Sequence, residues 1–290
     1  MKIDIKTNRL SLNYGNFHAL KDITLDLSEN KIYGLIGRNG AGKTSLLSLL
    51  ASYREPTSGT LKIMGQAPFE NPSIMQHVNF IYNFDHSDES ETIKGMLQIA
   101  ERYRSSFDSE YANQLIKKFH LPIDKPVKSL SKGMQSAMNV TIGLASRSPI
   151  TIFDEAYLGM DAPTREIFYH ELLEEQARNP RIIILSTHLV SEMEYLFDDI
   201  IIIDKGKLLL HEPYDALINR GVTITGDGNT VDDFVKGMNV LHEQKLGPTK
   251  AVTIYGELTD NQLRLADLSN LQLGPITLQN LFIFWTKEEE

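Results

Sequence analysis

The chain has 290 residues, of which 41% are hydrophobic and 23% are charged, and its formal net charge is -9 at pH 7. This length predicts one large and one small domain, and the composition is that of a folded globular protein rather than a disordered or fibrous one. The acidic balance disfavours general binding to nucleic acids, because it repels their phosphates. The sequence contains no cysteine, which excludes disulfides, zinc-thiolate sites and iron-sulfur clusters.

The sequence carries no signal for export or membrane insertion. Its first residues lack the apolar stretch of a signal peptide, and no apolar run approaches the roughly 18 residues of a membrane span. We therefore expect a cytoplasmic protein that reaches any membrane through a partner. The last three residues, Glu288–Glu290, are expected to form a solvated tail.

Strands alternate with helices over the first 215 residues. Short apolar runs predict the strands, and the most continuous of them are typical of parallel strands that are buried on both faces. These runs lie at residues 33–36, 60–64, 77–82, 150–153, 181–186 and 200–203, and helical spacing occurs at 45–53, 92–120 and 131–147. The pattern predicts a largely parallel sheet covered by helices, with a hairpin turn at 204–207 that adds one more strand.

The composition changes after residue 218, where glycines become frequent and separate short elements. The patterns predict strands at 222–225 and 251–255 and helices at 231–238, 260–266 and 277–285. We therefore expect a small α+β domain over residues 219–290. Its last helix is apolar enough either to pair subunits or to complete the core of this domain.

A phosphate-binding loop is the strongest motif. It fits the pattern G-x-x-x-x-G-K-[ST] and lies between a predicted strand and a predicted helix, as this loop requires. Its residues are Gly37, Arg38, Asn39, Gly40, Ala41, Gly42, Lys43 and Thr44, and Ser45 follows them. The glycines allow a tight turn whose N–H groups point at phosphate oxygens, Lys43 can reach the β and γ phosphates, and the Thr44 hydroxyl can ligate Mg²⁺. The alternative is an ordinary glycine-rich turn with an exposed lysine.

Two carboxylates, Asp154 and Glu155, follow the apolar run at 150–153. Ligands of open α/β sheets bind at the carboxyl ends of such strands. Asp154 suits a metal-holding role there, and Glu155 suits the polarisation of a water molecule. Adjacent carboxylates are also common as solvated loop ends, so the interpretation depends on the phosphate-binding loop.

A third motif indicates which family of nucleotide-binding proteins the chain resembles. Leu130-Ser131-Lys132-Gly133-Met134, ahead of a predicted helix, resembles the signature motif of the ATP-binding cassette (ABC) family, with lysine and methionine where glycine and glutamine are usual. Residues 158–161 resemble the D-loop of that family, with Met160 where leucine is usual, and His188 resembles its switch histidine. The motifs occur in the order of the family, and the resemblance covers about residues 1–215.

The resemblance implies roles for single residues. Ser131, Lys132 and Gly133 would face the γ phosphate of ATP bound by the other subunit of a dimer. His188 would hydrogen-bond the γ phosphate and the attacking water, and Tyr14 would stack on adenine. From the residues alone, Ser131 is also explained as a helix N-cap and Tyr14 as an aromatic packed at a strand end.

One position departs from the family. A glutamine or glutamate usually ends the strand that aligns with residues 77–82, and Asn83 stands there in this chain. Its side chain is one methylene shorter, so contact with Mg²⁺ at this position is in question and would run through water.

The resemblance implies a P-loop NTPase fold of the ABC ATPase type: an α/β core over residues 1–215, with an antiparallel β portion near the N-terminus and a helical subdomain at about 85–147. It implies a head-to-tail homodimer or heterodimer that hydrolyses ATP with Mg²⁺ and serves a separate transmembrane permease subunit at the inner face of the cell membrane. No nucleic acid partner is expected. The expected catalytic residues are Lys43, Glu155 and His188, and the expected metal ligands are Thr44, Asp154 and Asn83.

Residues 274–282 resemble the tail of ATPase subunits of Gram-positive exporters for antimicrobial or toxic peptides. The whole chain is most similar to those of the phenol-soluble modulin exporter type, so peptide export is the expected function. Two alternatives stay open. An ABC ATPase acting on ribosomes or DNA would usually carry two cassettes, a long coiled coil or a basic patch, and a non-catalytic regulatory module would be expected to lack Glu155 or His188.

Overall fold

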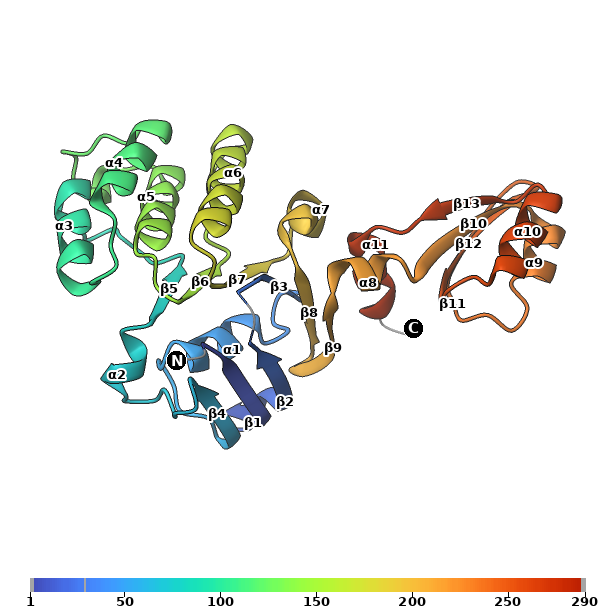
Figure 1. The fold of residues 1–290 in the computed structure, drawn as a ribbon, viewed down its shortest axis with the longest axis horizontal. Helices are drawn as coiled ribbons and strands as arrows, with labels where there is room; N and C mark the ends of the chain where they lie inside the picture. The colour runs from blue at the N-terminus through green and yellow to red at the C-terminus, as the bar shows by residue number, and fades with distance from the viewer. Residues whose placement is uncertain (1–2, 29, 288–290) are drawn as a thin grey trace. The chain divides into compact units, whose positions relative to one another are not determined.

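The computed structural model describes residues 3–28 and 30–287, and its contacts divide the chain into two units. The first unit runs through His188 and includes Tyr195–His211, whereas the second comprises Leu189–Glu194 and the chain from Glu212 on (Figure 1). The short segment Leu189–Glu194 therefore belongs to the second unit although residues of the first unit flank it on both sides. The tail expected at Glu288–Glu290 lies outside the described residues.

A six-stranded sheet forms the centre of the first unit, in the order β5-β6-β7-β3-β8-β9. Its strands are β3 (Ile32–Ile36), β5 (Val78–Tyr82), β6 (Ile150–Asp154), β7 (Ile182–Thr187), β8 (Asp199–Asp204) and β9 (Lys207–Pro213). The pairs from β5 through β8 are parallel. Every residue of β3, β6 and β7 is buried, as expected for strands covered on both faces. The predicted α/β class with a largely parallel sheet is confirmed.

A three-stranded antiparallel sheet completes the N-terminal part of this unit, in the order β2-β1-β4. Its strands are β1 (Ile5–Tyr14), β2 (Phe17–Leu27) and β4 (Ser58–Ile63). Buried residues of these strands, such as Leu12, form one hydrophobic core with Leu47 of helix α1 (Lys43–Leu50) and Ile184 of β7. This core fixes α1, and with it the preceding loop, against both sheets.

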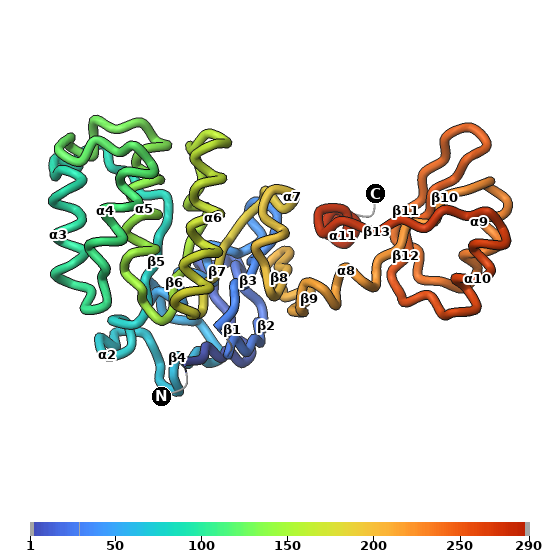
Figure 2. Tube along the Cα trace, turned by 45° about the horizontal axis from the view of Figure 1, so that its top comes forward, coloured from blue at the N-terminus to red at the C-terminus, as the bar shows by residue number. Residues whose placement is uncertain are grey.

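Helices α3 (Ile93–Tyr103), α4 (Ser109–Lys118) and α5 (Lys132–Ala145) contact one another and lie side by side in Figures 1 and 2. The helical pattern at 92–120 is thus split into two helices. Asp108 causes the second start, because its carboxylate accepts a hydrogen bond from the Tyr111 N–H and caps α4. Shorter elements are α2 (Pro72–Met75), η1 (Val127–Ser129) and η2 (Glu194–Leu196).

A buried ionic network joins α6 (Ala162–Arg178) to the end of α5 and the start of β7. The carboxylate of Glu175, with no exposed surface, lies 3.2 Å from Nη1 of Arg181 and 3.0 Å from Nε of Arg147. Arg181 also donates to the Leu144 carbonyl at 3.2 Å. Burial lowers the pKa of Arg181, and Glu175 opposes that effect. Loss of either the carboxylate or the guanidinium groups would leave a buried charge without its partner, which destabilises the fold.

The second unit contains a four-stranded antiparallel sheet in the order β11-β12-β10-β13. Its strands are β10 (Gly221–Asp227), β11 (Val240–Leu246), β12 (Thr249–Tyr255) and β13 (Gln272–Pro275), and its helices are α7 (Val190–Met193), α8 (Tyr214–Ile218), α9 (Gly228–Phe234), α10 (Asp260–Leu268) and α11 (Leu278–Trp285). The sequence pattern indicated neither β11 nor β13, whose residues are mostly exposed or half-buried. The helix expected at 231–238 begins and ends earlier, because Asp227 caps it and Gly237 adopts a φ of 78°.

Helix α11 packs within this second unit. Leu278 and Leu281 are fully buried, and the helix contacts α7 and β11. The ring of Phe284 stacks on His242 at 4.6 Å, and the backbone N–H of Leu278 donates to a carboxylate oxygen of Glu194 at 3.1 Å. Much of the apolar surface that the sequence assigns to this helix is therefore used in contacts inside the unit.

Candidate nucleotide site

The phosphate-binding loop follows β3 and leads into α1. Gly40 and Gly42 adopt φ angles of 81° and 110°, which only glycine adopts without strain. A Cβ atom on Gly42 would also approach the Ala19 carbonyl oxygen to 2.8 Å. The glycines of the motif are thus required by the backbone, and they place N–H groups of the loop at the N-terminus of α1, where an anion is favoured.

Lys43 lies inside this loop, with only 6% of its side chain exposed. Its ammonium group donates to the Gly37 carbonyl at 2.8 Å and the Arg38 carbonyl at 3.4 Å, and lies 3.6 Å from Oε1 of Glu155. The positive charge is therefore held at the centre of the loop by two carbonyl oxygens and a carboxylate oxygen.

Asp154 and Glu155 stand at the end of β6, beside the end of β7. The Ser186 hydroxyl donates to Oδ1 of Asp154, which is 7% exposed, and accepts from the Glu155 N–H at 3.0 Å. Glu155 has a φ of 49°, a left-handed conformation that costs energy for a residue with a Cβ. This backbone turn directs the Glu155 carboxylate toward both Lys43 and His188.

His188 follows β7, and its Nδ1 lies 3.1 Å from Oε1 of Glu155. The Tyr157 hydroxyl lies 3.4 Å from the same ring nitrogen. Lys43, Glu155 and His188 therefore converge from three elements that are distant in sequence. These three are the residues expected from the sequence to be catalytic.

An open cavity of about 600 Å³ lies over the loop. The loop residues from Arg38 to Ser45 line it, except for Ala41, and so do Asn83, Asp154 and Glu155. Thr44 and Asp154 thus share one cavity, and a hydroxyl and a carboxylate oxygen are ligands that suit Mg²⁺. The residues present fit this ion. The lining also includes the exposed Asn83, whose amide follows β5 as the alignment required.

Tyr14 and Phe17 occupy the two ends of the turn between β1 and β2. Phe17 lines the cavity and is 63% exposed, whereas Tyr14 is not among the lining residues. The Arg54 guanidinium lies over the Tyr14 ring at 4.7 Å from its centroid, and the Tyr14 hydroxyl is 3.5 Å from Oγ of Ser45. One face of Tyr14 is thus covered by a cation, whereas Phe17 and Tyr82 contribute aromatic rings to the lining of the cavity.

The signature-like segment begins α5. Ser131 is the N-cap, because its hydroxyl accepts from the Met134 N–H at 3.3 Å. Gly133 lies against the D-loop-like segment, since a Cβ there would approach the Gly159 carbonyl to 2.5 Å. Lys132 is exposed and lies 3.8 Å from Asp85. Ser131, Lys132 and Gly133 are not among the residues that line the cavity.

Sequence reasoning missed three residues around this site: Phe17, Tyr157 and Ser186. The hydroxyl of Ser186 ties Asp154 to Glu155, and Tyr157 contacts His188. Ser186 carried a signal, because it lies opposite Asp154 in a parallel pair whose strands end together. The aromatic residue at 157 directly follows the two carboxylates and Ala156, which is a weaker indication.

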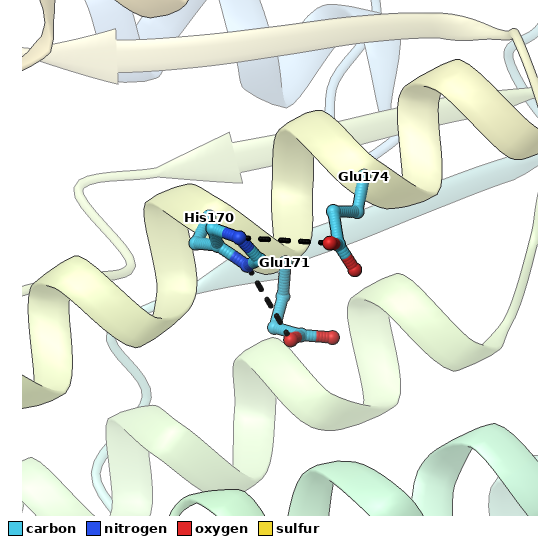
Figure 3. A group of neighbouring side chains, drawn as sticks. All are labelled: His170, Glu171 and Glu174. Carbon is cyan, nitrogen blue, oxygen red and sulfur yellow. Dashed lines mark ion pairs between the residues drawn. The ribbon is translucent and has the colours of Figure 1, made fainter.

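A separate group of ionisable side chains lies on α6: His170, Glu171 and Glu174 (Figure 3). His170 lies 3.8 Å from Glu171 and 3.5 Å from Glu174. Each carboxylate already has a cationic partner, Lys118 for Glu171 and Arg178 for Glu174. The group is therefore explained as ion pairs within α6 and between α6 and α4.

Within residues 3–28 and 30–287, no helix combines the length and the apolar character needed to cross a bilayer.

A family model described as ABC transporter matches residues 20–158. Three curated relatives match between 70% and 76% of the chain. The ABC transporter ATP-binding protein YtrB of Bacillus subtilis is 28% identical over 204 residues, 70% of each chain. The lantibiotic transport ATP-binding protein SrtF of Streptococcus pyogenes is 29% identical, over 74% of this chain and 93% of its own.

The bacitracin transport ATP-binding protein BcrA of Bacillus licheniformis is 30% identical over 224 residues, 76% of this chain and 73% of its own. A solved structure of the ATP-binding subunit of an ABC transporter has a TM-score of 0.67 at 24% identity, over 73% of this chain and 91% of its own. The fold is thus that of an ABC cassette, and the predicted fold class is confirmed. The chain belongs to the ABC transporter family and is one of its ATPases.

Proposed function

We propose that this chain hydrolyses ATP at the Gly37–Thr44 loop with Lys43, Glu155 and His188, and that the hydrolysis powers peptide export through a separate transmembrane permease. The main support for this site is the convergence of these three side chains, with Oε1 of Glu155 3.6 Å from the lysine nitrogen and 3.1 Å from the imidazole. Lys43 and Glu155 also line the cavity.

The loop N–H groups and the Lys43 ammonium bind the β and γ phosphates and stabilise the charge that develops in phosphoryl transfer. Glu155 orients the attacking water and accepts its proton. His188 donates to the γ phosphate through the ring nitrogen that does not face Glu155. Lys43 is the first residue of α1 and His188 directly follows β7, so a helix and a strand position these two donors.

Mg²⁺ would be held by Thr44 and Asp154, with Asn83 in reach of it through water. When bound, the ion neutralises negative charge on the phosphates. The Ser186 hydroxyl holds the Asp154 carboxylate in one orientation. A carboxylate held in this way binds a metal ion more strongly than one that rotates freely.

We propose that two copies, or this chain and a related ATPase, pair head to tail. In that arrangement Ser131, Lys132 and Gly133 of one subunit would complete the site of the other. Their absence from the lining of their own cavity supports this arrangement, as does the capped N-terminus of α5, which favours an anion. The permease would hold the pair at the cytoplasmic face of the membrane.

The C-terminal region from residue 219 has a separate proposed role, in pairing or regulation rather than chemistry. The support is that the residues lining the cavity all precede it, while its α11 packs on α7, which begins two residues after His188.

Peptide cargo is supported by the resemblance of the C-terminal segment and by the lantibiotic and bacitracin transport named for two relatives. The test uses inverted membrane vesicles from cells that express the chain together with a candidate permease, chosen as a polytopic membrane protein that a neighbouring gene encodes. Mg-ATP should drive uptake of a labelled amphipathic peptide, and vesicles with Glu155→Gln should take up none.

A labelled sugar serves as the control cargo. Vesicles that hydrolyse ATP but accumulate no peptide would refute the peptide assignment. If the chain instead sediments with ribosomes and is absent from the membrane fraction, it would be an ABC ATPase that is not coupled to transport, and this alternative would replace the proposal.

A further inference from the structure

Tyr157 is a buried aromatic residue between the Glu155 turn and the start of α6. Only 2% of it is exposed. Its hydroxyl lies 2.9 Å from Oγ1 of Thr187 and accepts from the His188 backbone N–H at 3.4 Å. The same hydroxyl lies 3.4 Å from Nδ1 of His188. A single oxygen atom thus contacts the last residue of β7 and both the backbone and the ring of the residue after it.

The contacts define the orientation of the His188 ring. Nδ1 faces a carboxylate oxygen of Glu155 at 3.1 Å, and an ionised carboxylate only accepts, so Nδ1 carries a hydrogen. Either hydroxyl of the Tyr157–Thr187 pair can be the donor. With Tyr157 as the donor, its oxygen accepts from the backbone N–H of His188 and keeps a lone pair for the Nδ1 hydrogen. Nε2 is then the ring nitrogen that neither Glu155 nor Tyr157 engages.

Packing alone does not require this hydroxyl. The rings of Tyr157 and His188 have centroids 6.2 Å apart and are tilted by 46°, so they do not stack face to face. A phenylalanine would fill nearly the same volume, yet it would leave the backbone N–H of His188 and one side of Nδ1 without this oxygen.

We propose that Tyr157 is a positioning residue for ATP hydrolysis, whose hydroxyl holds the His188 ring with Nε2 directed to the γ phosphate. The proposal rests on the role given to His188 above. Tyr157 touches neither substrate nor metal in this account and acts only through His188.

The test compares Tyr157→Phe with wild type in steady-state ATP hydrolysis by the full chain. Removal of one hydrogen-bonding group should lower kcat by about threefold to tenfold. KM for ATP should stay within about twofold, because the loop and Lys43 that bind the phosphates are unchanged. A merely structural role would lower the thermal midpoint and the fraction of active protein instead of kcat alone.

Tyr169→Phe is the matched control. Tyr169 is also a buried tyrosine, but it lies on α6 and packs against the rings of Phe168 and Tyr195. The same chemical change there should leave kcat as in wild type. Thr187→Val gives a second variant, since it removes the hydroxyl partner of Tyr157 while keeping the volume. It should lower kcat by about twofold, and the double variant should be no slower than Tyr157→Phe.

The outcomes separate this proposal from the proposed function. A strong loss in His188→Ala with wild-type turnover in Tyr157→Phe would overturn the positioning role alone. Wild-type turnover in His188→Ala would overturn both. Equal losses of kcat in Tyr157→Phe and Tyr169→Phe would also overturn the positioning role, because a hydroxyl remote from His188 would then matter as much.

Discussion

Oε1 of Glu155 lies 3.1 Å from Nδ1 of His188 because the two residues follow adjacent parallel strands, with Asp154 directly opposite Ser186. The carboxyl ends of β6 and β7 therefore bring a carboxylate and an imidazole to one edge of the sheet. Lys43 reaches the same oxygen from the loop after β3. Because one carboxylate contacts both groups, a change at Glu155 alters the surroundings of Lys43 and His188 as well.

Glu155→Gln tests the proposed role of Glu155 as the base that accepts the proton of the attacking water. The amide keeps the shape and its hydrogen bonds but does not accept the proton of the attacking water, so turnover should fall by about 10² or more while ATP still binds. Phosphate release measures the rate, and light scattering with ATP should detect a dimer that persists. Glu174→Gln, an exposed glutamate on α6, is the control. Full turnover in Glu155→Gln would remove this residue from the mechanism.

Asn83 tests how far the metal site reaches. If its shorter amide serves the ion through water, Asn83→Ala should raise the Mg²⁺ concentration needed for half-maximal ATPase activity by about threefold to tenfold. Asn83→Gln should match wild type. Titration of Mg²⁺ at saturating ATP gives the comparison. Identical titrations for wild type and Asn83→Ala would leave Asn83 without a part in metal binding.

Phe17 and Tyr14 differ in how well each is placed to stack on adenine. Since Phe17 lines the cavity and Arg54 covers one face of Tyr14, we expect Phe17→Ala to weaken ATP binding more than Tyr14→Ala. Base-aromatic stacking contributes about 1–3 kcal/mol, which corresponds to roughly fivefold or more in Kd. Equilibrium binding of a fluorescent ATP analogue to each variant measures this. A larger loss in Tyr14→Ala would restore the role that the resemblance implies.

The core of the fold was predictable because its signals are strong and local. Continuous apolar runs mark the buried strands, and the loop at 37–44 has a backbone that only its glycines allow. Parallel strands that end together also place Asp154 near Ser186. Phe17 and Tyr157 escaped prediction because their part in the site depends on tertiary contacts, and a tyrosine or phenylalanine in isolation indicates only burial.

The second unit was less predictable for a physical reason. β11 and β13 are partly exposed strands of a small sheet, so they lack the alternation that marks a half-buried strand. Leu189–Glu194 belongs to this unit because α7 contacts α11, which is distant in sequence. The local periodicity of the sequence does not indicate such a contact. Helix α11 itself was predicted from its apolar spacing.

The buried network at Glu175 predicts a stability effect in the first unit. Glu175→Gln removes the charge that compensates Arg181 and Arg147, and breaking a buried pair in this way costs about 3–5 kcal/mol. Urea unfolding followed by circular dichroism measures the loss. Glu174→Gln affects only the exposed contacts with Arg178 and His170 on the same helix and should cost less than about 1 kcal/mol. Equal effects of the two substitutions would contradict the structural role of Glu175.

The last prediction concerns the link between α7 and the C-terminal region. Leu281 is fully buried on α11, which packs on α7, and α7 begins two residues after His188. Leu281→Ala removes methyl groups from this contact and should destabilise the second unit by about 2–5 kcal/mol. Since a looser α7 restrains the backbone after His188 less, kcat should also fall by about twofold or more, with KM for ATP unchanged.

Both effects can be read in the same protein. Trp285 is the only tryptophan in the sequence and packs against Tyr255 at 5.0 Å, so its fluorescence in urea follows the second unit. Leu265→Ala on α10, where the side chain is half exposed, is the control and should change neither quantity much. If Leu281→Ala lowers the urea midpoint of Trp285 fluorescence but leaves kcat at the wild-type value, α7 does not transmit the state of the C-terminal region to His188.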